Sequence, residues 1–116
     1  NLKKIINIIH PEIKKKKNIF LKNNKKKKIV VLDIPLLLEN KLNQNGDIII
    51  FIQSKKLEVT KRLKKRNGFN LRLFNKFEKI QFSSSYKKKK SHFIIKNNFT
   101  NKFAKMNVKK ILKKIL

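Results

Sequence analysis

The sequence predicts an α/β fold in which a parallel β-sheet is flanked by helices. Short runs rich in β-branched residues alternate along the chain with segments in which apolar residues recur every three or four positions. The strand-like runs are continuous rather than alternating, which is typical of strands buried on both faces of a parallel sheet. Strands that alternate with helices in this way are joined by right-handed crossovers.

The N-terminal part of the chain predicts two consecutive helices. Apolar residues at positions 2, 5, 6 and 9 follow the helical period. Pro11 suits the first position of a second helix, which extends to about Leu21, because that position needs no backbone N–H donor. A lysine-rich connection, residues 22–28, follows.

Three runs predict strands and four further segments predict helices. The run at 29–32 ends at Asp33, and the Asn45–Gly46 turn introduces the second run. The predicted strands are residues 29–33, 47–53 and 93–95, and the later helices are residues 57–65, 71–80, 84–90 and 101–116.

The formal net charge is +27, with 33 lysine and arginine residues against six acidic ones. Such a balance ordinarily indicates a nucleic-acid partner. Only Arg62, Arg66 and Arg72 are arginines, however, and the excess of Lys, Asn, Ile and Phe is typical of an AT-rich genome. Because specific nucleic-acid readers favour arginine, we interpret most lysines as solvated surface. We expect weak, salt-sensitive binding to polyanions but no specific nucleic-acid partner.

Composition also bears on compartment. The chain has no cysteine, so disulfides and thiolate metal sites are excluded. No apolar run approaches the ~20 residues that span a bilayer, and Lys3, Lys4 and Asn7 interrupt any signal-peptide pattern. We therefore expect a cytoplasmic protein without a membrane partner. The first residue is Asn1 rather than Met, which suggests a missing upstream segment.

Several motifs stand in the order and spacing of one family. Residues 30–39 read V-V-L-D-I-P-L-L-L-E, and this block resembles the V-V-x-D-I-P-L-L-F-E signature of dephospho-CoA kinases. The other matching residues are His10, Pro11 and Ile13, Arg62 and Leu63, Arg66 to Gly68, Gln81, Lys87, and Phe93 to Asn97. The resemblance covers nearly the whole chain.

This resemblance implies a P-loop NTPase fold of the nucleotide-kinase type. Residues 1–116 would be the C-terminal part of a single domain, with a helical lid at about 55–91. The implied reaction transfers the γ-phosphoryl of ATP to the 3′-hydroxyl of dephospho-CoA, with Mg²⁺ as the metal in the intact enzyme. Dephospho-CoA and ATP are thus the expected partners, and the resemblance leaves the oligomeric state open.

The chain departs from the family pattern in several places. A Walker A loop needs G-x-x-x-x-G-K-[ST], which the only two glycines, Gly46 and Gly68, do not provide. We therefore expect the isolated chain to be inactive. His92 replaces the usual aspartate before the last strand, and Phe77 stands where an arginine is common in the lid.

Asp33, Arg62 and Arg66 are the expected catalytic residues. Asp33 leaves a strand end, the usual place for ligand contact in an open parallel sheet, although it could equally cap the following turn. Arg62 and Arg66 are four residues apart and would share one helical face. Their planar guanidinium groups suit bidentate phosphate contact, and the alternative is a solvated helical face.

Five further residues are expected to contact dephospho-CoA or ATP. Pro35 and Leu36 would shape the acceptor-side turn. The resemblance implies that Gln81 and Lys87 would help the lid to close, with a solvated helical surface as the alternative for Lys87. Asn97 would hydrogen-bond the adenine of ATP, with a role in the turn as the alternative.

The sequence predicts no metal site and leaves two alternative functions open. His10 and His92 have no partner spacing for a metal site or a triad, so we expect structural roles and no protein-only metal site. One alternative function is a small basic RNA- or ribosome-associated protein. The other is a different nucleoside monophosphate kinase of the same fold.

Overall fold

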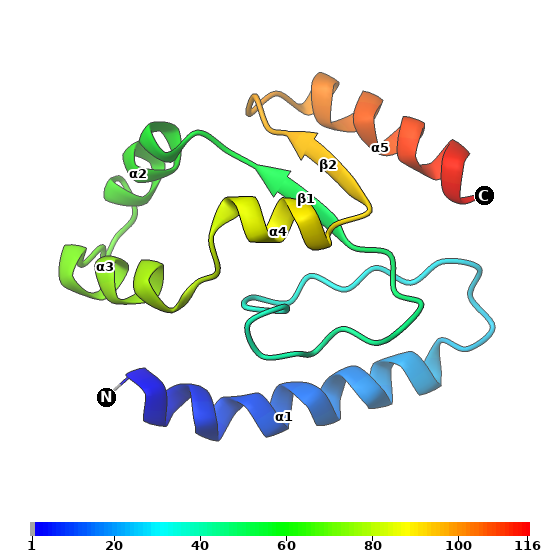
Figure 1. Cartoon of the computed structure of the whole chain (residues 1–116), viewed down its shortest axis with the longest axis horizontal. Coiled ribbons are helices and arrows are strands. Elements are labelled where there is room, and N and C mark those ends of the chain that lie inside the picture. The colour runs from blue at the N-terminus through cyan, green and yellow to red at the C-terminus, as the bar shows by residue number, and fades with distance from the viewer. Residues whose placement is uncertain (1) are drawn as a thin grey trace. The chain divides into compact units, whose positions relative to one another are not determined.

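A computed structural model describes residues 2–116 of the chain (Figure 1). The chain divides into two compact units, one ending at Gln44 and the other comprising Asn45–Leu116. Each unit is described by itself below.

The first unit opens with a single helix, α1, Leu2–Asn23. The prediction of two helices is wrong, because Pro11 lies inside α1. Pro11 lacks the N–H that would bond to the carbonyl four residues earlier, but its fixed φ is compatible with a helix. His10 and Lys17, on either side of it, both bond to the segment 40–42, which anchors both halves of α1.

The predicted strand at residues 29–33 does not form. Residues 29–34 have no regular secondary structure, and Val31 is 80% exposed. A strand is defined by its ladder, and the only strand pairing in the described part of the chain joins two segments of the second unit. The β-branched run therefore has a high strand propensity but no neighbouring strand with which to pair.

The second unit contains two parallel strands, β1, Ile50–Gln53, and β2, Phe93–Lys96. Ile50 lies opposite Phe93 and Gln53 opposite Lys96. The predicted α/β class and the parallel pairing are confirmed. Burial of the strands on both faces is wrong for Ile52 and Ile94, which are 58% and 46% exposed, because a two-stranded sheet leaves much of its surface uncovered.

Helices connect and follow these strands in the second unit. The predicted bounds agree with the structure to within a residue or two, and three of the four helices begin at a capping side chain. Asn70, Ser83 and Thr100 each accept a hydrogen bond from the backbone N–H three residues later. In chain order the helices are α2, Lys56–Lys64; α3, Leu71–Ile80; α4, Ser84–Lys90; and α5, Asn101–Ile115.

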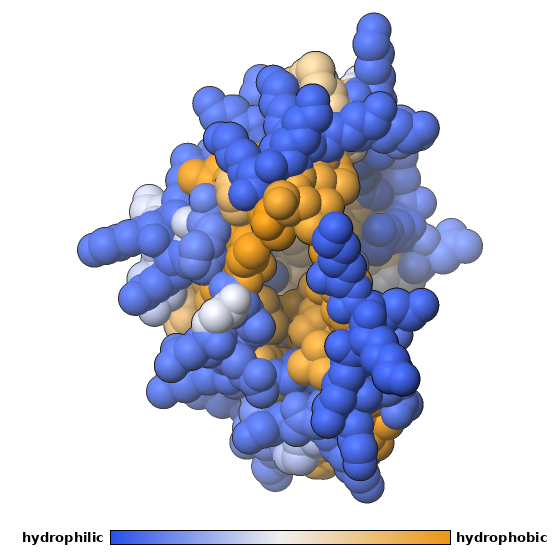
Figure 2. Space-filling model, turned by 90° about the vertical axis from the view of Figure 1, so that its right-hand side faces the viewer, coloured by the Kyte–Doolittle hydropathy of each residue, from blue (hydrophilic) through white to orange (hydrophobic). Residues whose placement is uncertain are grey.

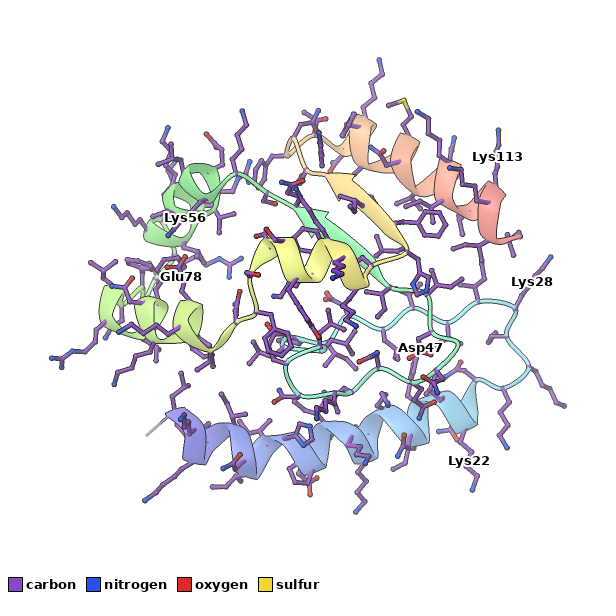
Figure 3. All side chains as sticks on the ribbon, in the orientation of Figure 1. Lys22, Lys28, Asp47, Lys56, Glu78 and Lys113 are labelled. Atoms are coloured by element: carbon purple, nitrogen blue, oxygen red, sulfur yellow. The ribbon has the colours of Figure 1, made fainter. Side chains whose placement is uncertain are left out.

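The helices α2 and α3 are linked by an ion pair at the surface. Lys56 Nζ lies 3.5 Å from Glu78 Oε1, and Figure 3 shows the two side chains pointing toward one another. Because the Lys56 side chain is 76% exposed, the pair is worth at most about 1 kcal/mol. Lys22, Lys28 and Lys113 instead point away from the ribbon (Figure 3), consistent with solvated lysines.

The buried core is small. Among the described residues the buried apolar side chains are Leu42, Ile95 and Ile111. Many larger apolar side chains stay partly exposed, and Figure 2 shows them between the hydrophilic ones. In residues 2–116 no helix has the length and apolar character to cross a membrane.

Candidate functional site

The candidate site of the second unit lies where the two strands end. The Asn97 backbone N–H donates to the carbonyl of Gln53 at 2.7 Å, which joins the carboxyl ends of β2 and β1. The Asn97 side chain donates through Nδ2 to Ser54 Oγ at 3.2 Å and accepts at Oδ1 from the Phe99 N–H at 2.8 Å. Asn97 therefore connects the end of β1 to the loop after β2 through its backbone and its side chain. Its observed role is that of a turn residue.

Arg62 of α2 reaches the same edge. Its Cζ atom lies 4.1 Å from the centroid of the Phe99 ring, which is a close cation–π contact. Arg62 is exposed, and none of its guanidinium N–H groups has a hydrogen-bond or ion-pair partner in residues 2–116. The guanidinium group thus lies over the Phe99 ring, and the N–H donors at its edge remain available for a ligand.

Arg66 does not share a helical face with Arg62. The helix α2 ends at Lys64 and Lys65 is its C-cap, so Arg66 lies beyond the helix. The Phe69 N–H donates to the Arg66 carbonyl at 3.3 Å, and Gly68 has φ of 79°. This is the geometry of a type II turn, in which the third residue requires a positive φ. The Arg-Asn-Gly motif therefore stops the helix and turns the chain.

In the first unit, Asp33 lies in a segment without regular secondary structure, before the turn at residues 35–41. Its side chain is exposed and has no hydrogen-bond or ion-pair partner in the part of the chain described. Pro35, which is also exposed, opens the turn, and Leu36 has φ of 55°. Capping by Asp33, the structural alternative, is not observed, and the carboxylate stays accessible to solvent.

The turn that follows closes like the end of a helix. The Leu42 N–H donates to the Leu37 carbonyl at 2.9 Å, and the Lys41 N–H donates to the Leu38 carbonyl at 3.2 Å. Lys41 has φ of 52°, and Leu42 is 3% exposed. These features make a Schellman motif, with Lys41 at the left-handed position that glycine usually occupies.

Two side chains of α1 fasten this turn. His10 Nε2 lies 2.9 Å from the Asn40 carbonyl oxygen. Because a carbonyl only accepts, Nε2 must carry the proton. Lys17 is buried and donates to the Leu42 carbonyl at 2.6 Å. The expected structural role of His10 is supported, whereas nothing in the sequence patterns set Lys17 apart from its neighbouring lysines.

His92 has a comparable role at the start of β2. Its Nδ1 accepts a hydrogen bond from the Ile49 N–H at 2.9 Å, and the backbone N–H of His92 donates to the Ile49 carbonyl at 2.8 Å. The imidazole therefore extends the strand ladder by one position. An aspartate carboxylate could accept the same bond, which explains how histidine can replace it.

Gln81 and Lys87 belong to the helical region between the strands. Gln81 is the exposed C-cap of α3, and its N–H donates to the Phe77 carbonyl at 3.2 Å. Lys87 is half-buried in α4, and its carbonyl accepts from Ser91 Oγ at 2.6 Å. Gln81 therefore ends α3 and Lys87 lies within α4, both in the segment 55–91 for which a lid is predicted.

An open cavity of about 340 Å³ lies beside the strand ends. Gln53 and Lys96 contribute to its wall, and the buried Gln53 Oε1 has no hydrogen-bond partner among the described residues. A buried acceptor without a partner is uncommon in folded proteins. The other lining residues are Lys88, Ile94, Phe103 and Asn107.

Phe99 is the residue that the sequence patterns missed. It has φ of 61°, rare for an aromatic residue, and it lies outside every apolar run. Its position between Asn98 and Thr100, both good turn formers, was the available signal.

Comparison with known proteins extends this picture. A family model described as dephospho-CoA kinase matches residues 1–102. Similar curated proteins are the dephospho-CoA kinase of Ehrlichia canis, 33% identical over 91% of this chain and 54% of that protein, and that of Wolbachia pipientis, 30% identical over 97% and 58%. The Bacillus cereus dephospho-CoA kinase is 33% identical over 97% of this chain and 56% of that protein.

The chain thus spans between 54% and 58% of the length of these three relatives. The matched region includes Asp33 and the turn after it, the segment from Arg62 to Arg66, and both strands. Because the family model covers most of the chain, this protein belongs to the dephospho-CoA kinase family, which has a P-loop kinase fold.

Proposed function

We propose that this chain contributes to ATP-dependent phosphorylation of the 3′-hydroxyl of dephospho-CoA. The observation that carries the proposal is the strand-end site, where Arg62 is held against Phe99 with its N–H donors unused. A guanidinium in this state suits the bidentate recognition of a phosphate. Membership of the dephospho-CoA kinase family indicates which phosphates Arg62 would bind, because both proposed substrates, ATP and dephospho-CoA, carry phosphate groups.

The proposed roles follow the chemistry of each side chain. Arg62 and Arg66 neutralise charge on the transferring phosphoryl group. Asp33, exposed and without a partner in the described residues, contacts the acceptor side, where Pro35 and Leu36 shape the turn. Gln81, Lys87 and Asn97 make the remaining contacts, the first two from the lid and Asn97 with the adenine.

Mg²⁺ accompanies ATP in this proposal. In residues 2–116 no group of three or more His, Asp or Glu side chains is gathered around a metal-sized space. Mg²⁺ characteristically takes one or two carboxylates together with substrate phosphates and water. Asp33 fits that limited role, whereas this chain does not enclose the ion by itself. Bound Mg²⁺ would neutralise phosphate charge.

We also propose that the chain alone does not catalyse the reaction. Gly46 and Gly68 stand in separate turns, so no Walker A loop is present in the sequence to cradle the phosphates. An assay that couples ADP release to dephospho-CoA should therefore show no turnover with the isolated chain. Turnover above the no-enzyme rate would contradict this.

A chimera tests the function itself. A segment of the Wolbachia enzyme that carries a P-loop is fused ahead of this chain, and ADP release is measured with dephospho-CoA or AMP as acceptor. We expect turnover with dephospho-CoA, and a loss of about a hundredfold in Arg62→Lys, which keeps the charge but not the fork. A folded chimera that phosphorylates only AMP would favour a different nucleotide kinase.

A further inference from the structure

Phe99 sits in a strained conformation that its neighbours impose. Its φ of 61° places a bulky side chain in the left-handed region, which is unfavourable for an L-residue other than glycine. The Phe99 N–H is held by Asn97 Oδ1 at 2.8 Å, while Asn98 Oδ1 accepts from both the N–H and the Oγ1 of Thr100. Such strain persists only where surrounding structure over-determines it.

The loop that holds Phe99 is fixed at both ends. On one side Asn97 bonds to Gln53 and Ser54 at the end of β1. On the other side Thr100 caps α5 through a hydrogen bond from the Phe103 N–H at 3.4 Å. The direction of the aromatic ring is therefore set by the strand ends and by the start of α5.

The ring in turn sets the direction of Arg62. An exposed arginine normally samples many rotamers, and ordering it has an entropic cost. Stacking on a fixed ring at 4.1 Å restricts the guanidinium without using any N–H donor. A lysine or carboxylate partner would have repelled it or occupied its donors.

From this arrangement we propose that Phe99 is a positioning residue, which orients the Arg62 guanidinium for an external phosphate group. The inference rests on the proposed phosphate-binding role of Arg62 and extends it to a residue that makes no ligand contact of its own. The ligand chemistry is a polyphosphate chain, as in ATP or inorganic tripolyphosphate.

The test measures tripolyphosphate and ATP affinity of the full 116-residue chain by titration calorimetry at several salt concentrations. The variants are Phe99→Leu, which keeps apolar bulk without a π face, Arg62→Lys, and the double variant. Arg72→Lys is the matched control, because it makes the same substitution at an exposed arginine outside the site. Ring-current shifts of the Arg62 side-chain protons, measured by NMR, report the stacking directly.

We expect Phe99→Leu and Arg62→Lys each to lower the affinity for tripolyphosphate and for ATP by about three- to fivefold, given the strength of exposed cation–π contacts. The double variant should be no weaker than the weaker single variant, and Arg72→Lys should match the wild type. The ring-current shift should vanish in Phe99→Leu although the fold is retained.

Additive losses, or unchanged affinity in Phe99→Leu, would overturn the proposal. So would a wild type that binds tripolyphosphate no more tightly than Arg62→Lys does.

Phe99→Gly separates the two effects of this residue, since it relieves the backbone strain but removes the ring. It should weaken tripolyphosphate binding as much as Phe99→Leu does. Because the tripolyphosphate measurement does not involve dephospho-CoA, its result is independent of the chimera experiment on the proposed reaction.

Discussion

Two segments of this protein have the same sequence pattern but different structures. Residues 29–33 and residues 93–97 are both short apolar runs that end in a polar side chain. The second run forms β2, and its exit at Asn97 is tied to β1. The first run has no ladder, and Asp33 at its end has no hydrogen-bond partner in residues 2–116. A β-branched run therefore has a high propensity for a strand, but the strand forms only where a neighbouring strand pairs with it.

A proline placed in each run tests this comparison with the largest expected effect. Ile95 lies in the ladder opposite Ile52 and is 8% exposed. Ile95→Pro should cost about 3 kcal/mol or more, because it disturbs the ladder and removes a buried side chain. Val31→Pro should change stability by less than about 0.5 kcal/mol, since Val31 is exposed and lies in no strand ladder.

Urea unfolding followed by circular dichroism would measure both variants. Equal losses in the two runs would show that residues 29–33 are paired in solution, and the distinction drawn between the two segments would fail.

The polar residue at the end of β2 gives the next largest effect. Asn97→Ala removes one side-chain donor and one acceptor, leaves the Phe99 N–H without its partner and should cost about 2 kcal/mol. Asp33→Ala is the matched change at the other run and should cost close to nothing. Asn97→Asp retains the acceptor for Phe99 and should lose about half as much. Thermal unfolding ranks the three variants, and an Asn97→Ala protein as stable as the wild type would contradict the assigned role of the side chain.

His92 tests the beginning of the ordered strand. His92→Ala leaves the Ile49 N–H without its side-chain acceptor and should cost about 1 kcal/mol. His92→Asp should restore most of this, because a carboxylate can accept the same hydrogen bond. Hydrogen exchange at the Ile49 amide is the direct measurement, since protection should fall in the alanine variant and return in the aspartate one. Unchanged protection in His92→Ala would mean that the ladder does not depend on the side chain.

Much of the second unit was predictable because its signals are local. Helical periodicity alone predicted the bounds of α3, α4 and α5 closely, and the structure adds that Asn70, Ser83 and Thr100 cap their first turns. The errors at Pro11 and at residues 29–33 share one cause, since helix continuity and strand pairing depend on contacts distant in sequence.

The site shows the same limit. Arg62 and Asn97 could be selected by residue type, but the stacking of Arg62 on Phe99 requires the loop conformation. The shared helical face of Arg62 and Arg66 failed for a local reason, because the Asn67–Gly68 turn lies too close to the end of α2. The ligand-binding or catalytic role of every predicted site residue remains a prediction: Asp33, Pro35, Leu36, Arg62, Arg66, Gln81, Lys87 and Asn97.

The smallest expected change in stability is a stabilisation. It concerns Lys41, in the hydrogen-bonded turn that follows residues 29–33. Lys41 occupies the left-handed position of the Schellman motif, where its Cβ is unfavourable. Lys41→Gly should raise the free energy of unfolding by up to about 1 kcal/mol, an increase limited by the greater entropy of glycine in the unfolded chain. Lys41→Ala removes the same charge but keeps the Cβ, so it should give no such increase. A stabilisation of equal size in both variants would show that relief of charge repulsion, rather than backbone conformation, was responsible. Thermal unfolding at low and high salt separates these causes, because only the electrostatic contribution is screened.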